Sequence, residues 1–107
     1  MYYDKNGEKI TLENWVKKFE IFDYRRVGMY ENCLVKISTV WLGLDHSFGC
    51  GKIKIFETMV FSKWTGHGDL YCARYTTLKQ AEAGHKIAVK MFRWHIGLVI
   101  RDYIWGR

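Results

Sequence analysis

The sequence predicts an α+β fold: an antiparallel β-meander of about four strands, with a short N-terminal helix and a long C-terminal helix packed on the sheet. Apolar residues alternate with a period of two through the middle of the chain and recur at helical spacing near both ends. The alternating segments are joined by short loops, which favours antiparallel pairing of neighbours. At 107 residues the chain has the length of one domain, so we assign residues 1–107 to a single domain.

The N-terminal elements are predicted from turn and capping signals. Asn6-Gly7 predicts a tight turn between two short strands within residues 1–10. Thr11 is placed to cap a helix over Leu12–Phe22, with Glu13 in the first turn, where the helix dipole favours negative charge. One side of this helix collects its apolar residues, namely Leu12, Trp15, Val16 and Phe19.

Four further segments alternate as strands do: Tyr24–Tyr30, Cys33–Gly43, Ile53–Phe61 and Leu70–Tyr75. In the third segment, Glu57 shares a face with Ile55 and Met59. We expect that face to belong to the core. A buried Glu57 carboxylate would then need a hydrogen-bonding or charged partner.

The last helix is predicted to begin at Thr77, which forms a capping-box pattern with Gln80. Gly97 is the expected end. The stripe expected to face the sheet comprises Leu78, Ala81, His85, Ala88, Val89, Phe92 and Ile96. A second apolar face, which widens the stripe and could meet another surface, comprises Ile87, Met91, Trp94 and Leu98.

Composition excludes several classes of protein. Hydrophobic residues make up 49% of the chain and aromatic residues 17%, which is incompatible with intrinsic disorder. No segment has the roughly 20 uninterrupted apolar residues of a membrane span, and the N-terminus lacks a signal-peptide pattern. We therefore expect a cytoplasmic protein of its host cell, with no membrane partner. Three cysteines without a CxxC pair indicate reduced thiols and neither a disulfide framework nor a zinc knuckle.

The net charge of +6 is concentrated toward the C-terminus. Residues 76–107 carry six basic side chains against two acidic ones, which leaves an excess of four positive charges there. These basic residues either form the solvated face of an amphipathic helix, or they bind nucleic acid or an acidic protein surface.

Three segments, in order, resemble a known family. They are Ser38–Gly49 (STVWLGLDHSFG), Ile55–Phe61 (IFETMVF) and the pair Arg74–Thr77 (RYTT) with Ala81–His85 (AEAGH). Together they are similar to a family of small, functionally uncharacterised proteins that is widespread in tailed phages and prophages. The resemblance covers about residues 1–90 and implies a phage context but no activity. The chain departs from the family at Cys50-Gly51-Lys52, where proline-rich sequence is frequent, and in its longer, more aromatic tail from Met91.

Catalysis has little support in the sequence. Asp45, His46, Glu57 and His85 could form a polar network, and His46, Glu57 and His85 could in principle bind a metal or transfer protons. None of these residues has the spacing of a ligand motif, and serine and cysteine lack any nucleophile signature. A structural network is the favoured interpretation, so we predict no enzyme activity and no cofactor.

Binding of a macromolecule is the leading functional hypothesis. The large aromatic and basic residues expected to contact a partner are Trp64, Lys90, Arg93, Trp94, Arg101, Tyr103 and Trp105. The expected partner is a host or defence-system protein, by association with phage inhibitors of CRISPR and other defences. Two alternatives stay open: nucleic-acid binding through the basic helix and sheet aromatics (Tyr24, Tyr30, Trp41, Phe56 and Trp64), and a homodimer sealed by residues 96–105.

Overall fold

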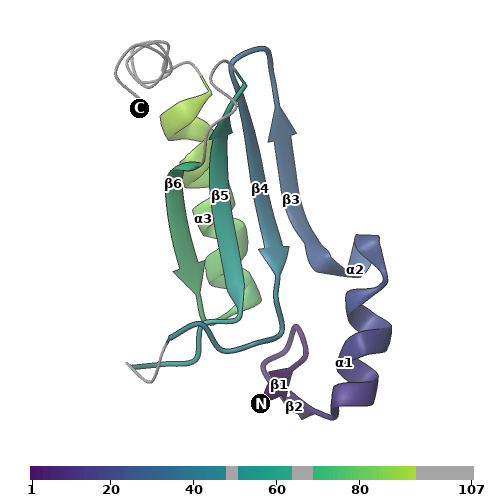
Figure 1. Ribbon diagram of the computed structural model, residues 1–107. Coiled ribbons are helices and arrows are strands. Elements are labelled where there is room, and N and C mark those ends of the chain that lie inside the picture. Colours follow the sequence, from purple (N-terminus) through teal and green to yellow (C-terminus); the bar gives the residue numbers. More distant parts are fainter. Residues whose placement is uncertain (48–50, 64–68, 94–107) are drawn as a thin grey trace.

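The computed structural model describes residues 1–47, 51–63 and 69–93 (Figure 1). Its main sheet has four strands in the order β3-β4-β5-β6, all antiparallel, and α3 packs along one face of this sheet. The α+β prediction is therefore confirmed. The strands of this sheet and the long helix are β3 (Arg26–Glu31), β4 (Val35–Trp41), β5 (Phe56–Ser62), β6 (Asp69–Tyr75) and α3 (Leu78–Phe92).

The N-terminal elements form a separate small layer at one end of the sheet. The strands β1 (Tyr2–Tyr3) and β2 (Lys9–Ile10) pair around the predicted Asn6-Gly7 turn, in which Gly7 has a φ of 85°. They are followed by α1 (Leu12–Phe19) and α2 (Phe22–Arg25). The Thr11 hydroxyl caps α1 by accepting from the Asn14 N–H at 3.2 Å, as the sequence predicted.

The predicted boundary between the first helix and the strand that follows it was wrong. The first helix ends at Phe19 and not at Phe22, because α2 starts a new turn there. That turn occupies Tyr24 and Arg25, which had been assigned to a strand, so β3 begins only at Arg26. Apolar residues on both sides of the junction make the period ambiguous at this point.

The core lies between the inner face of the sheet and α3, and it continues toward the N-terminal layer. Val35, Ile37 and Val60 form one cluster with Ala88 and Phe92 of α3. A second cluster of buried residues consists of Tyr3, Trp41, Ile55, Phe56 and Ala81. The stacked rings of Trp15 and Phe19 pack against this second cluster, which attaches α1 to the end of the sheet.

The face of β5 that is buried is the opposite of the predicted one. Phe56, Thr58, Val60 and Ser62 point inward, whereas Glu57 and Met59 lie on the outer face. Both faces of this segment carry apolar residues, so alternation alone could not decide which face packs on the helix.

The helix α3 begins as predicted. Thr77 and Gln80 form the capping box, with the Thr77 hydroxyl accepting from the Gln80 N–H at 3.1 Å. Ala81, Ala88 and Phe92 of the predicted stripe are buried. Ile87 and Met91 are instead 54% and 41% exposed, and the stripe's last residue, Ile96, lies outside the described residues.

Candidate partner-binding site

A chain of hydrogen-bonded hydroxyl groups lies between the sheet and α3 and ends on His85. The Tyr75 O–H donates to Thr58 Oγ1 at 3.1 Å, and the Thr58 and Thr39 hydroxyls are 2.5 Å apart. Thr39 Oγ1 is 2.8 Å from Nδ1 of His85. Every hydroxyl is satisfied if the donors run from Tyr75 through Thr58 and Thr39 to Nδ1, which makes the imidazole a neutral acceptor. Burial lowers the pKa of His85, in agreement with a neutral ring.

Two glycines make this chain of hydroxyls sterically feasible. A Cβ on Gly28 of β3 would lie 2.6 Å from Cδ2 of His85, and a Cβ on Gly84 would collide with the ring of Tyr75. The absence of a side chain at both positions lets α3 approach the sheet closely. His85 and Tyr75 are thereby held between the helix and the strands.

Glu57 and His85 of the predicted polar network lie on opposite faces of the sheet. Glu57 lies on the outer face of the sheet, where Nε of Arg74 donates to its carboxylate at 3.0 Å, whereas His85 lies against the inner face. The sheet separates these two residues, so they cannot share a metal ion or a proton. Within the described ranges, no group of three or more histidine, cysteine and acidic residues is placed to hold a metal ion.

Asp45 forms hydrogen bonds within its own loop and to the segment before β5. Its carboxylate accepts from the backbone N–H groups of Lys54 and Ser47, both at 2.9 Å, and from the Ser47 hydroxyl at 2.9 Å. These hydrogen bonds, that of Lys54 first, lower the pKa of Asp45. The neighbouring His46 N–H donates to the Lys54 carbonyl at 2.7 Å. The Asp45-His46 pair therefore fixes the loop that leaves β4 against the segment that enters β5.

The most strongly charged feature of α3 is a row of basic side chains, which we call the cationic ridge. It consists of Lys79, Lys86, Lys90 and Arg93. Spacings of seven, four and three residues place them along one side of the helix. All four are exposed, and within the described part of the chain none of them forms an ion pair. Lys86 and Lys90, four residues apart, repel each other by about 0.2–0.5 kcal/mol. The helix dipole favours the positive charges of Lys90 and Arg93 at the C-terminus of α3 by a similar amount, so the ridge contributes little net stability.

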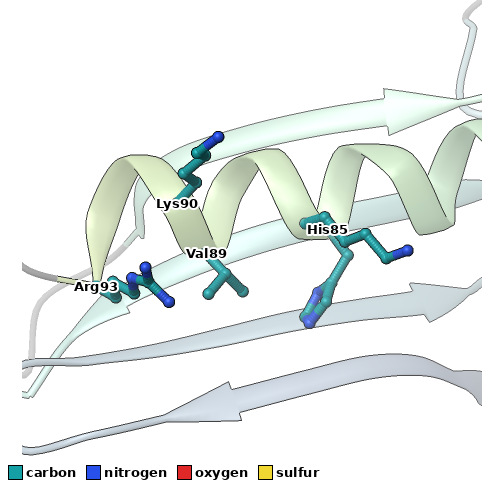
Figure 2. Close-up of a pocket in the computed structure, with 5 residues that line it drawn as sticks. His85, Val89, Lys90 and Arg93 are labelled. Carbon is teal, nitrogen blue, oxygen red and sulfur yellow. The ribbon is translucent and has the colours of Figure 1, made fainter.

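A shallow groove runs beside the ridge, and one part of it lies between α3 and the edge strand β3. It comprises two adjoining hollows of about 310 Å³ each, which share His85 and Lys86. Val27 and Glu82 line one hollow, and Val89, Lys90 and Arg93 line the other. Figure 2 shows the His85 ring and the Val89 side chain directed from α3 toward the neighbouring strands.

Asn32 sets the position of Arg93 at the end of this groove. Its Nδ2 donates to the Arg93 carbonyl at 2.8 Å, and its Oδ1 accepts from the N–H groups of Leu34 and Val35 at 2.7 and 2.9 Å. One side chain thus closes the β3–β4 turn and attaches the C-terminus of α3 to it.

A second cationic pocket lies on the other side of β3, on the outer face of the sheet. We call it the outer pocket. It has a volume of about 190 Å³ and is lined by Phe22, Arg25, Arg26, Met29, Lys36, Ser38 and Val40. The guanidinium of Arg25 lies 4.8 Å from the ring centre of Phe19 and 5.5 Å from that of Phe22. Nε of Arg25 is buried and has no hydrogen-bond partner among the described residues.

The residues predicted to contact a partner are only partly described. Lys90 and Arg93 belong to the cationic ridge and are exposed. The other five, Trp64, Trp94, Arg101, Tyr103 and Trp105, lie outside the described residues, as does the segment 96–105 from which a homodimer contact was expected. The outer pocket has no local sequence signal, because Lys36 joins Arg25 and Arg26 in its lining only through the pairing of β3 with β4.

The sheet aromatics do not form a surface on which bases could stack. Trp41 and Phe56 are fully buried, and Tyr24 packs edge-on against Trp41 with ring centres 4.9 Å apart. Tyr30 packs against the core cluster beneath α3, and Trp64 lies outside the described residues. The core therefore takes Trp41 and Phe56, and Tyr24 and Tyr30 are partly buried against it.

The described elements define a small α+β protein with a charged border around one edge strand and without a metal-ligand cluster. Among the described residues, no helix combines the length and the apolarity needed to cross a membrane. Comparison of the chain with family models, with curated proteins and with solved structures found no match.

Proposed function

We propose that this protein is a phage-type accessory protein that acts by binding a host protein with an acidic surface. The observation that carries the proposal is the cationic ridge. Its four exposed basic side chains have no ion-pair partner within the described residues. A cluster of this kind raises the rate and the specificity of association with a complementary surface.

The surroundings of the ridge favour a protein partner over nucleic acid. Ile87 and Met91 are exposed beside the ridge and supply apolar contact area of the kind found at protein interfaces. The burial of Trp41 and Phe56 removes stacking platforms that a single-stranded nucleic acid would use. The phage resemblance adds, by association, a component of a host defence system such as CRISPR as the class of partner.

The test is affinity capture from lysates of infected or lysogenic host cells, with and without nuclease. The ridge variant carries Lys86→Gln, Lys90→Gln and Arg93→Gln. The matched control carries Lys9→Gln, Lys17→Gln and Lys52→Gln, which removes the same number of charges at three exposed positions elsewhere.

We expect the native protein to capture a host protein whose recovery does not depend on nucleic acid. The control should capture the same protein after nuclease treatment, and the ridge variant should not. Capture of nucleic acid alone, with every protein lost on nuclease treatment, would instead support the nucleic-acid alternative. Equal capture by the ridge variant and the control would show that the ridge is not the binding site.

A further inference from the structure

We infer that the edge of β3 that faces away from β4 receives an extended acidic segment of the partner protein, which adds to the sheet as a further antiparallel or parallel strand. This inference deepens the proposed function and rests on it. It specifies that the acidic partner binds as an extended strand. Among the described elements, β3 is an edge strand that pairs with β4 alone. Edge strands offer unpaired N–H and C=O groups to a second chain.

The register identifies the backbone groups at this edge. The Asn32 N–H donates to the Val35 carbonyl and therefore points toward β4. In an antiparallel ladder this direction alternates along the strand, so the N–H and C=O of Met29 and Glu31 point away from β4. Glu31 pairs with Lys36 across the strands, and Met29 pairs with Ser38, which places both residues within the regular part of β3.

Positive charge flanks this edge on both sides. The groove beside α3 contributes Lys86, Lys90 and Arg93, and the outer pocket contributes Arg25, Arg26 and Lys36. Side chains of an added strand alternate between the two sides, about 6.6–6.8 Å apart on each. Acidic residues lie at this edge as well: Glu82 lines the groove, Asp23 pairs with Arg26 at 2.8 Å, and Glu31 pairs with Lys63. The cations outnumber them on each side, so acidic side chains of the added strand meet a net positive charge whichever way the strand faces.

The dimensions of the ridge and the strand agree. Seven residues separate Lys86 from Arg93, which corresponds to about 10 Å along the helix. Two or three alternate side chains of an extended segment cover that length. In Figure 1, α3 runs along the strands, so the ridge and the β3 edge follow the same direction. Apolar side chains of the segment would contact Val27 and Val89 on one side, or Phe22 and Met29 on the other.

The probe is a synthetic peptide of about eight residues that alternates glutamate with valine, long enough to span β3. A peptide with lysine in place of glutamate controls for strand propensity, and a single-stranded oligothymidylate tests nucleic acid. Fluorescence anisotropy gives the affinities. Hydrogen exchange of the Met29 and Glu31 amides reports whether the edge is paired. The protein is the full chain in each measurement.

Two proline variants separate backbone pairing from charge. Met29→Pro removes an N–H that points outward and leaves the bonds to β4 in place, while Cys72→Pro is the matched change at an outward position of the opposite edge strand, β6. We expect the acidic peptide to bind, the lysine peptide not to bind, and Met29→Pro to weaken the affinity about tenfold. Cys72→Pro should leave the affinity unchanged, and both edge amides should gain protection.

Should Met29→Pro fail to fold, peptides N-methylated on alternate residues make the same test with the native protein. One set should lose binding and the other retain it, because only one set of N–H groups faces β3. Equal affinities for both sets would overturn the strand inference. Loss of binding in the ridge variant together with unchanged binding in Met29→Pro would also overturn it, but would leave the proposed function standing. Binding of the oligothymidylate alone would overturn both.

Discussion

The inner face of the sheet and the border around β3 are built from different chemistry. Val35, Ile37, Trp41, Phe56 and Val60 are all fully buried on the inner face, which carries no charged residue of β4 or β5. The border gathers six basic side chains in the groove and in the outer pocket. The inner face supplies the stability of the fold, and under the proposed function the border supplies the contacts to the partner. Substitutions should therefore separate cleanly into two groups.

Trp41→Ala should have the largest effect. The side chain is fully buried, and its Nε1–H donates to the Tyr3 carbonyl at 3.1 Å, so the change removes both packing and the attachment of β1. We expect the free energy of unfolding to fall by about 3–5 kcal/mol. Urea unfolding followed by circular dichroism measures this change. A loss below about 1 kcal/mol would contradict the assignment of Trp41 to the core.

Thr39→Val should have the next largest effect. The change keeps the shape of the side chain but removes the hydroxyl that links Thr58 to Nδ1 of His85. We expect a loss of about 1–3 kcal/mol, because a buried hydroxyl and a buried ring nitrogen lose their partner. Ser38→Ala, on the other face of the same strand, is the control and should change the free energy of unfolding by less than about 0.5 kcal/mol. Equal effects of the two changes would exclude the hydroxyl chain as a source of stability.

The pH dependence of stability should report on His85. Burial depresses its pKa below the ordinary value of 6.5, so the unfolded state binds the proton more tightly than the folded state. Stability should therefore be full above pH 6.5, fall as the pH drops below it, and level off once the pH passes the folded pKa. His85→Gln should flatten this part of the profile. Chemical denaturation across this range tests it, and an unchanged slope in His85→Gln would assign the effect to other groups.

Neutralising the cationic ridge should have the smallest effect on stability. The variant relieves the repulsion between Lys86 and Lys90 but loses the favourable interaction of Lys90 and Arg93 with the helix dipole. Because the two effects oppose each other, the free energy of unfolding should change by less than about 0.5 kcal/mol. Thermal unfolding beside the Lys9/Lys17/Lys52 control measures it. A large destabilisation would mean that the border also holds the fold together, and the contrast between the two regions would disappear.

Much of the fold could be predicted from the sequence because its signals are local. Thr11 and Gln80 lie three residues from their capping partners, and the α3 stripe has a regular period. The buried face of β5 could not be predicted, because Met59 on one face and Val60 on the other are equally apolar. Packing of α3 decides between them.

The candidate site could be predicted only in part. Lys90 and Arg93 could be identified as candidate contact residues because basic residues on a helix are expected to be exposed. The hydroxyl chain was missed because Thr39 lies 46 residues from His85 and 19 from Thr58, so no local motif records it. The groove and the outer pocket likewise depend on strand pairing, since β3 has to lie beside both α3 and β4.

The most direct test of the central claim is the affinity of the ridge variant for the captured host protein, measured beside the matched control at low and moderate salt. The account predicts that the ridge variant binds at least about tenfold more weakly and that this difference shrinks as salt screens the charges. The control should bind as the native protein does. Equal affinity of the two variants at every salt concentration would contradict the account, because the cationic ridge would then have no part in binding the partner.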